Sequence, residues 1–159
     1  MKKTSKLAYS IIIVGITAAL CSYYNQIGLK NFYYDLILPP LVPPSFVFSA
    51  VWVLLYALLI GSFFIVSIKS EGETFRRHNF WFLGQSVLQI LWTYAYFYLG
   101  ALGPAAIIIL LLDYNVFMMI KSFRETDKLA SYLQYPYMLW VLFATYLNFA
   151  FVYYNGTFI

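Results

Sequence analysis

Five apolar stretches dominate the sequence, and segments that are polar or rich in proline and glycine separate them. They run over residues 7–24, 46–68, 80–99, 104–120 and 133–154. Each has about the length, roughly 17–25 residues, that a helix needs to cross the hydrocarbon core of a bilayer. Helices suit that medium because they satisfy their own backbone hydrogen bonds. The pattern predicts an all-α fold, an integral membrane bundle of five transmembrane helices that forms a single domain over residues 1–159.

The composition supports this fold class. Hydrophobic residues make up 63% of the chain and charged residues 10%, and the mean hydropathy is +0.75. A soluble domain carries roughly a quarter charged residues, so most of the outer surface is expected to face lipid. The single cysteine, Cys21, excludes an internal disulfide and a cysteine-based metal cluster. We interpret Cys21 as a small packing residue.

The basic residues predict how the bundle is oriented. Five spans place nine bases on one side, namely Lys2, Lys3, Lys6, Lys69, Arg76, Arg77, Lys121, Arg124 and Lys128. Only Lys30 falls on the other side. Cytoplasmic loops carry the excess of lysine and arginine, so we expect the N-terminus inside and the C-terminus outside. The first apolar run also resembles a signal peptide, but no A-x-A site follows it, and we expect a retained helix.

The net charge of +4 is therefore assigned to topology and anionic headgroups, and no nucleic-acid partner is expected. His78, the only histidine, stands beside Arg76, Arg77 and Asn79. We interpret it as a solvated interfacial loop residue, and we expect no metal site. The sequence contains no P-loop, GxSxG or HExxH motif.

Asp113 is the only acidic residue within a predicted span. A carboxylate near the bilayer centre costs roughly 2.5–3.5 kcal/mol on insertion scales. The residue should therefore face the bundle interior or a wet cavity, or be protonated. An interhelical hydrogen bond and a contact with a ligand both remain open as its role.

Three spans carry aromatic stripes at helical spacing. One face of the third span carries Gln85, Gln89, Trp92 and Tyr96; the second span carries Phe48, Trp52 and Tyr56; the fifth carries Trp140, Ala144 and Asn148. Residues at these intervals share a helix face. Facing one another, the stripes would form an apolar pocket with a few polar groups, as in small-molecule sites. Ordinary packing and interfacial aromatic belts are the alternatives.

The first loop, residues 25–44, contains Pro39, Pro40, Pro43 and Pro44. Such a segment is stiff and extended. It is either a lid over the mouth of the bundle or a helix stop followed by a helix start. In the second span, Ala57-x-x-x-Gly61 is a weak signal for a homodimer.

Three stretches carry a family resemblance. The first is Tyr33-Tyr34-Asp35-Leu36 with Pro39, Pro43-Pro44, Val51-Trp52 and Leu55-Tyr56; the second is Gly84-Gln85, Gln89, Trp92 and Leu112-Asp113; the third runs from Tyr135-Pro136-Tyr137-Met138-Leu139-Trp140 to Phe143-Ala144-Thr145-Tyr146-Leu147-Asn148. Together they resemble the TspO/MBR family of tryptophan-rich sensory and translocator proteins. The third stretch is similar to the family signature PYLxWxxFATxLN and is the most specific.

The resemblance implies a five-helix bundle, often a dimer, in a bacterial cell membrane, with a pocket that opens toward the first loop. Members bind porphyrins and haem-type tetrapyrroles; porphyrin or haem would be a ligand and no other cofactor is required. Carried over by position, the pocket residues are Tyr33, Trp52, Gln89, Trp92, Asp113, Trp140, Ala144 and Asn148, and Tyr56 joins them from its stripe. Some bacterial members degrade protoporphyrin in light, which implies Trp52 and Trp140 as candidate catalytic residues.

The chain departs from the family pattern in places that bear on selectivity. Phe32-Tyr33 replaces a Trp-Tyr pair, Leu41-Val42 replaces the usual tryptophan before Pro-Pro, and Gln89 replaces an asparagine. No base follows Tyr146, Tyr153 or Tyr154, so cholesterol recognition through its proposed motif is not expected. The leading hypothesis is a tetrapyrrole-binding sensor, scavenger or regulator. The alternatives are a light-dependent porphyrin-degrading enzyme and a transporter, although internal repeats typical of transporters are absent.

Overall fold

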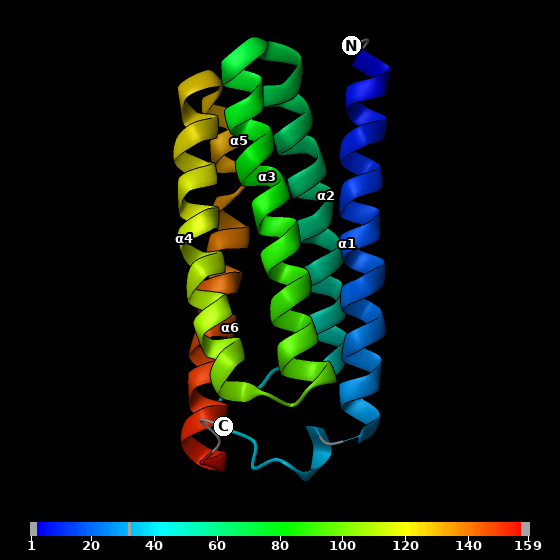
Figure 1. Cartoon of the computed structure of the whole chain (residues 1–159), viewed down its shortest axis with the longest axis vertical. Helices are drawn as coiled ribbons and strands as arrows, with labels where there is room; N and C mark the ends of the chain where they lie inside the picture. Colours follow the sequence, from blue (N-terminus) through cyan, green and yellow to red (C-terminus); the bar gives the residue numbers. More distant parts are fainter. Residues whose placement is uncertain (1–2, 32, 157–159) are drawn as a thin grey trace.

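A computed structural model describes residues 3–31 and 33–156 of the chain. The described part is helical, with elements α1 (Lys3–Asn31), η1 (Tyr33–Asp35), α2 (Ser45–Lys69), α3 (Gly72–Thr93), η2 (Tyr94–Tyr98), α4 (Leu102–Thr126), α5 (Lys128–Tyr132) and α6 (Tyr135–Asn155). Figure 1 shows the long helices side by side in an elongated bundle, with α1 beginning at one end and α6 ending at the other. The predicted all-helical class is confirmed.

Four segments are long and apolar enough to cross a membrane: α1, α2, α4 and the α5–α6 unit over Lys128–Asn155. Large apolar side chains such as Ile12, Val53 and Leu139 are exposed on the outside of the bundle. Polar side chains such as Gln85 and Asn148 are buried inside it. This distribution, with apolar groups outside and polar groups inside, is that of a protein whose solvent is lipid, and the protein is an integral membrane protein.

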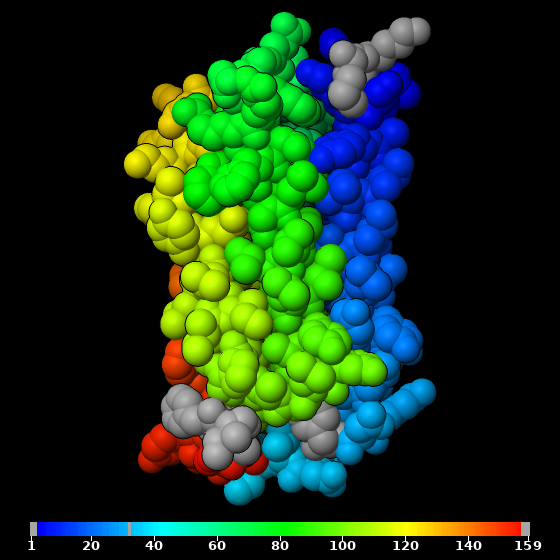
Figure 2. All heavy atoms as spheres, in the orientation of Figure 1, coloured from blue at the N-terminus to red at the C-terminus, as the bar shows by residue number. Residues whose placement is uncertain are grey.

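α3 is the fifth long helix, and it packs along α4. Figure 2 shows α3 between α1 and α4, in close contact with both helices along this face. The polar first turns and interior amides of α3 lower its average hydropathy. Its outward face is nevertheless apolar, since Phe80, Val87 and Leu91 are exposed there.

The loops are shorter than predicted at the end of the bundle that carries most of the basic residues, which we call the basic end. The sequence predicted loops over residues 69–79 and 121–132, but Ser70 and Glu71 alone separate α2 from α3. Gly72 adopts a φ of +55° at this turn, a conformation that glycine adopts without strain. α4 continues to Thr126, and the Asp127 side chain then caps α5 by accepting a hydrogen bond from the Ala130 amide at 2.9 Å. Helical order therefore reaches into the interfacial region on this side.

His78 is not the solvated loop residue that was predicted. It lies in α3, fully buried, with Nδ1 2.8 Å from Ser122 Oγ and Nε2 2.8 Å from Thr126 Oγ1. The prediction was wrong because the charged neighbours Arg76 and Arg77 point outward from the same helix turns. Burial, together with the Arg77 guanidinium, lowers the pKa of His78 to about 4. The ring is therefore neutral at neutral pH.

This lowered pKa predicts acid sensitivity. The folded pKa of His78, about 4, lies below its ordinary 6.5, so the unfolded chain takes up the proton first as pH falls. The contribution of neutral His78 to the free energy of unfolding is fully present above pH 6.5. It declines as the pH falls toward 4, by up to about 1.4 kcal/mol per pH unit. The thermal midpoint in detergent should fall between pH 7 and pH 5, and His78→Gln should flatten that profile. Equal slopes for both proteins would contradict this account.

The first loop closes the end of the bundle opposite most of the basic residues (Figure 1). After η1 the chain continues through a turn at Pro40 and Leu41 to Pro44, which precedes the first residue of α2. Asn155 near the end of α6 fastens the loop, because it accepts a hydrogen bond from the Ile37 amide at 2.8 Å and donates one to the Ile37 carbonyl at 3.1 Å. Phe32, a position where the chain departs from the family pattern, lies outside the described residues.

A close approach fixes α1 against η2. A Cβ atom on Gly28 would lie 2.5 Å from the Phe97 carbonyl oxygen and 2.9 Å from its Cα. Backbone cannot move aside as a flexible side chain can, so only glycine fits here. Gly15, on the same helix, has open space around the corresponding position.

We predict that Gly28→Ala destabilises the bundle by about 1–3 kcal/mol, the usual cost of overpacking. Gly15→Ala is the matched control and should be neutral, or stabilising by up to about 1 kcal/mol through helix propensity. Thermal unfolding in the same detergent measures both. Equal effects of the two substitutions would show that α1 does not depend on the contact with Phe97.

Candidate functional site

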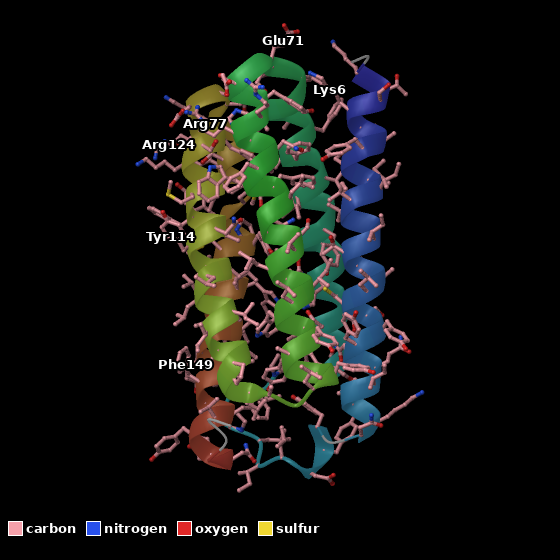
Figure 3. All side chains as sticks on the ribbon, in the orientation of Figure 1. Lys6, Glu71, Arg77, Tyr114, Arg124 and Phe149 are labelled. Carbon is pink, nitrogen blue, oxygen red and sulfur yellow. The ribbon has the colours of Figure 1, made fainter. Side chains whose placement is uncertain are left out.

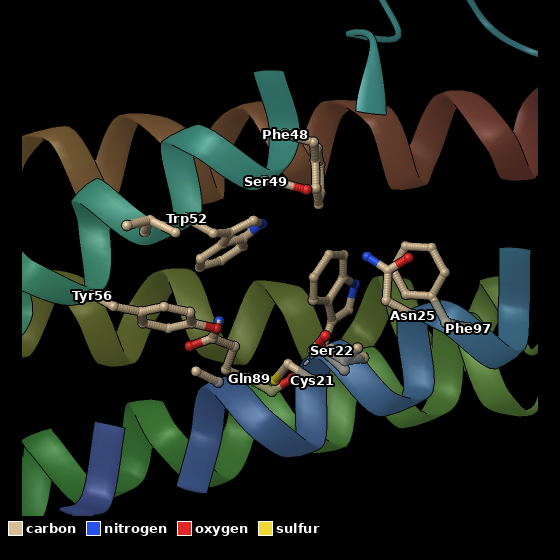
Figure 4. A pocket seen from close by; sticks show the side chains of 13 residues that line it. Cys21, Ser22, Asn25, Phe48, Ser49, Trp52, Tyr56, Gln89 and Phe97 are labelled. Atoms are coloured by element: carbon tan, nitrogen blue, oxygen red, sulfur yellow. Dashed lines mark hydrogen bonds between the residues drawn. The ribbon is translucent and has the colours of Figure 1, made fainter. Parts of the chain in front are cut away.

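A cavity of about 270 Å³ lies between α1, α2, α3 and η2. Figure 4 shows it between α1 and α2. Its lining comprises Ala18, Cys21, Ser22 and Asn25 from α1, Phe48, Ser49, Trp52, Val53 and Tyr56 from α2, and Gln89, Trp92, Thr93 and Phe97 from α3 and η2. The stripes predicted on the second and third spans therefore meet at one cavity.

The walls of this cavity are mostly flat rings. Trp52 and Tyr56 lie one helical turn apart with ring centroids at 5.4 Å and planes tilted by 30°. Phe48 continues this row, 6.2 Å from Trp52. Gln89 supplies a polar group opposite them, and its side-chain nitrogen donates to the Tyr56 hydroxyl at 2.8 Å. The cavity can thus stack a planar apolar guest and offer it a few hydrogen-bonding groups.

α1 also forms one wall of the cavity, which the sequence pattern did not predict. Cys21 is buried as predicted, but it lines the cavity together with Ser22 and Asn25. These residues are small and polar within an apolar helix, which is the signal that could have found them. Among the described residues, the buried side-chain oxygen of Asn25 has no hydrogen-bond partner.

The cavity opens between α1 and α2. Ser22 on α1 and Ser49 and Val53 on α2 line it and are also exposed. Because these helices carry apolar side chains on their outer faces, the opening is directed toward lipid. A guest dissolved in the bilayer could enter here without crossing water.

A second, smaller cavity of about 40 Å³ lies toward the first loop. Phe48, Trp92 and Phe97 line both cavities and separate them. The smaller cavity also contacts three of the other predicted pocket residues, namely Tyr33, Ala144 and Asn148. Seven of the nine predicted ligand-binding residues thus line one cavity or the other.

Asp113 and Trp140 line neither of these two cavities. Asp113 accepts a hydrogen bond from the Thr145 hydroxyl at 2.8 Å, an interhelical bond between α4 and α6. Its other carboxyl oxygen has no partner among the described residues. Trp140 packs against Phe48 at 5.5 Å, and its buried indole nitrogen is also unpartnered there. Trp140 therefore contacts a residue that lines the cavity but does not line the cavity itself.

Hydrogen bonds between helices hold the walls in place. The Trp92 indole donates to the Asn148 side-chain oxygen at 2.9 Å, and the Asn148 nitrogen donates to the Leu102 carbonyl at 2.9 Å. Tyr137 on α6 donates to the Gln85 oxygen at 2.9 Å. Asn148 and Gln85, two amides of the predicted stripes, are therefore already engaged, and they position the rings around the cavity.

A π-helical turn, η2, ends α3. The wider turn changes which residues face the interior after Thr93, and Ala95, Tyr96 and Phe97 are all buried. Phe97 reaches both cavities as a result. Such turns are common at functional sites, and no pattern in the sequence predicted this one.

Fold and interior together define a helical integral membrane protein with an aromatic-walled cavity that opens toward lipid. The chain belongs to the TspO/MBR family, whose profile matches residues 9–154. It is similar to a tryptophan-rich protein TspO of Archaeoglobus fulgidus, at 32% identity over 91% of this chain and 94% of the relative. A Bacillus cereus protein of the same name is 28% identical over 93% and 94%, and protein CrtK of Rhodobacter capsulatus is 30% identical over 70% and 71%. The family resemblance is confirmed.

The contact between Trp92 and Asn148 leads to a testable prediction. Asn148→Leu keeps the branched shape of the side chain but leaves the buried Trp92 indole N–H without an acceptor, which costs about 1–3 kcal/mol. The thermal midpoint should fall accordingly. The same substitution in a Trp92→Phe background, where no N–H is left unpaired, should cost less. Additive losses in this cycle would show that the bond does not stabilise the wall.

Proposed function

We propose that the protein binds a planar tetrapyrrole of the porphyrin or haem type in the cavity between α1, α2 and α3. The observation that carries this proposal is the row of rings formed by Trp52 and Tyr56 opposite Trp92 and Gln89. Flat walls stack on a flat macrocycle through dispersion and offset ring contacts. Gln89 and Asn25 offer polar groups to its edge.

The enclosed volume argues for a guest that is only partly enclosed. At about 270 Å³ the cavity lies just below the usual range for small-molecule sites. A macrocycle would therefore extend through the opening beside Ser22 and Ser49, or displace Phe48 and gain the volume of the smaller cavity. Its carboxylate edge would lie toward the membrane surface, where water is available.

We further propose that all five long helices span the membrane. α3 together with η2 is as long as its neighbour α4, and it exposes apolar side chains outward. Average hydropathy alone therefore understates the suitability of α3 as a membrane span. Apart from Lys30, the bases of the described residues gather at one end of the bundle, where Lys6, Arg77 and Arg124 lie in Figure 3. The positive-inside rule then places this end and the N-terminus in the cytoplasm of a bacterial cell, and the first loop and the C-terminus outside.

A binding protein that senses, scavenges or regulates tetrapyrroles is the function that this site supports best. Light-dependent degradation of the bound porphyrin is the second candidate. The arrangement of Phe48, 6.2 Å from Trp52 and 5.5 Å from Trp140, favours it, because the two indoles are joined through one ring at the cavity wall. The excited macrocycle would supply the photochemistry, dissolved dioxygen would be the oxidant, and the indoles would relay electrons.

Protoporphyrin titration tests the site. The Soret band should shift saturably, and Trp52→Ala should raise Kd about tenfold, equivalent to about 1.4 kcal/mol of lost stacking. Trp81→Phe, which changes a tryptophan outside both cavities, is the matched control and should stay within about twofold. Non-saturable binding, or equal effects of the two substitutions, would overturn the proposal.

Illuminating the same complex separates the two candidate functions. If the protein degrades porphyrin, the Soret band should decay faster in the unaltered protein than in Trp140→Phe. If it only binds porphyrin, the two decay rates should be equal.

A further inference from the structure

A second concave site lies away from the aromatic cavity, between α3 and α4 at the basic end of the bundle. It is an open groove of about 350 Å³, lined by Arg77, Phe80, Trp81, Met118, Lys121, Ser122 and Glu125. It shares no residue with either aromatic cavity. The proposed tetrapyrrole function does not use it.

The two ends of this groove differ in polarity. Arg77 and Lys121 are exposed at the outer part of the groove. Phe80, Trp81 and Met118 supply apolar surface, and the rings of Phe80 and Trp81 meet edge to face at 5.0 Å. A charged rim above an apolar floor matches a molecule with an ionic head and a hydrocarbon tail. Tryptophan at this level is typical of the membrane interface.

The charges favour a head that is negative. Arg77 pairs with Glu125 across the groove, with both side chains about half exposed. Within the part of the chain that the structure describes, Lys121 forms no ion pair, and neither does Arg124 one turn further along α4. Two cationic groups therefore remain without a counter-charge beside the groove. Anionic lipids of the cytoplasmic leaflet carry the complementary charge.

We propose that this groove binds one anionic phospholipid molecule. The phosphate lies between Arg77 and Lys121, and the Ser122 side of the groove stays closed because that hydroxyl already bonds His78. One acyl chain runs down over Phe80 and Met118 toward the bilayer centre. Lys121 supplies the preference for negative lipids, since it is the lining base that has no partner of its own.

Brominated lipids test this proposal, because bromine quenches an indole that it contacts. The full chain is placed in phosphatidylcholine nanodiscs with rising fractions of brominated phosphatidylglycerol or brominated phosphatidylcholine. The Trp81 signal is the difference between the unaltered protein and Trp81→Phe. Quenching of Trp81 should need about fivefold less of the brominated phosphatidylglycerol, the effect expected for one unpaired base near the surface.

Charge variants make the result specific. Lys121→Gln should abolish most of the fivefold preference, and Lys121→Arg should keep it. Lys128→Gln removes a base from the same side outside the groove and should leave the preference unchanged. Equal quenching by both lipids, or an equal loss in Lys128→Gln, would overturn the proposal. Displacement of the lipid by millimolar inorganic phosphate would also overturn it, since the groove would then be an anion site rather than a lipid site.

Discussion

The bilayer core offers no water to a polar side chain, so a buried polar group is stabilised chiefly by a partner within the bundle. α3 shows the consequence most clearly. Its Gln85, Gln89 and Trp92 bond Tyr137, Tyr56 and Asn148, which belong to α6 and α2. These bonds tie three helices together at the level of the aromatic rings. The cavity walls are held by polar pairs within a largely apolar core.

α1 is attached in a different way. Its buried positions are mostly small, namely Ser10, Val14, Thr17, Cys21 and Gly28, and they recur at intervals of three, four and seven residues, as along the contact line of a coiled coil. Several of its large apolar residues, such as Ile11, Ile12 and Ile16, are exposed on the outside of the bundle. A helix held by small residues approaches its neighbours closely at Gly28 and leaves unfilled space beside Cys21, where no bulky side chain enters. The cavity therefore results from the small side chains on the buried face of α1.

Much of this arrangement could be predicted, because residues that face the interior of a membrane bundle recur in the sequence at helical spacing. The stripes containing Trp52 and Gln89 face one cavity as their spacing indicated. The burial of His78 could not be predicted, since its charged sequence neighbours suggested solvent while its helix face pointed inward. The π turn and the contact of Gly28 with Phe97 also left no local signal, because both depend on how two helices meet in space. The spacing of residues identifies a helix face but not which residues lie opposite it. For this reason the sequence could not predict that Trp140 packs against Phe48 and does not line the cavity.

Cys21 is the only cysteine of the chain, and it lies on the cavity wall. A protein with a single thiol carries its own attachment point for chemistry that is selective for sulfur. No cysteine-free background has to be constructed before a spin label, a fluorine tag or an alkylating reagent is introduced at this position. The rate at which a small electrophile reaches the thiol would therefore report, in real time, whether the chamber beside it is vacant or filled.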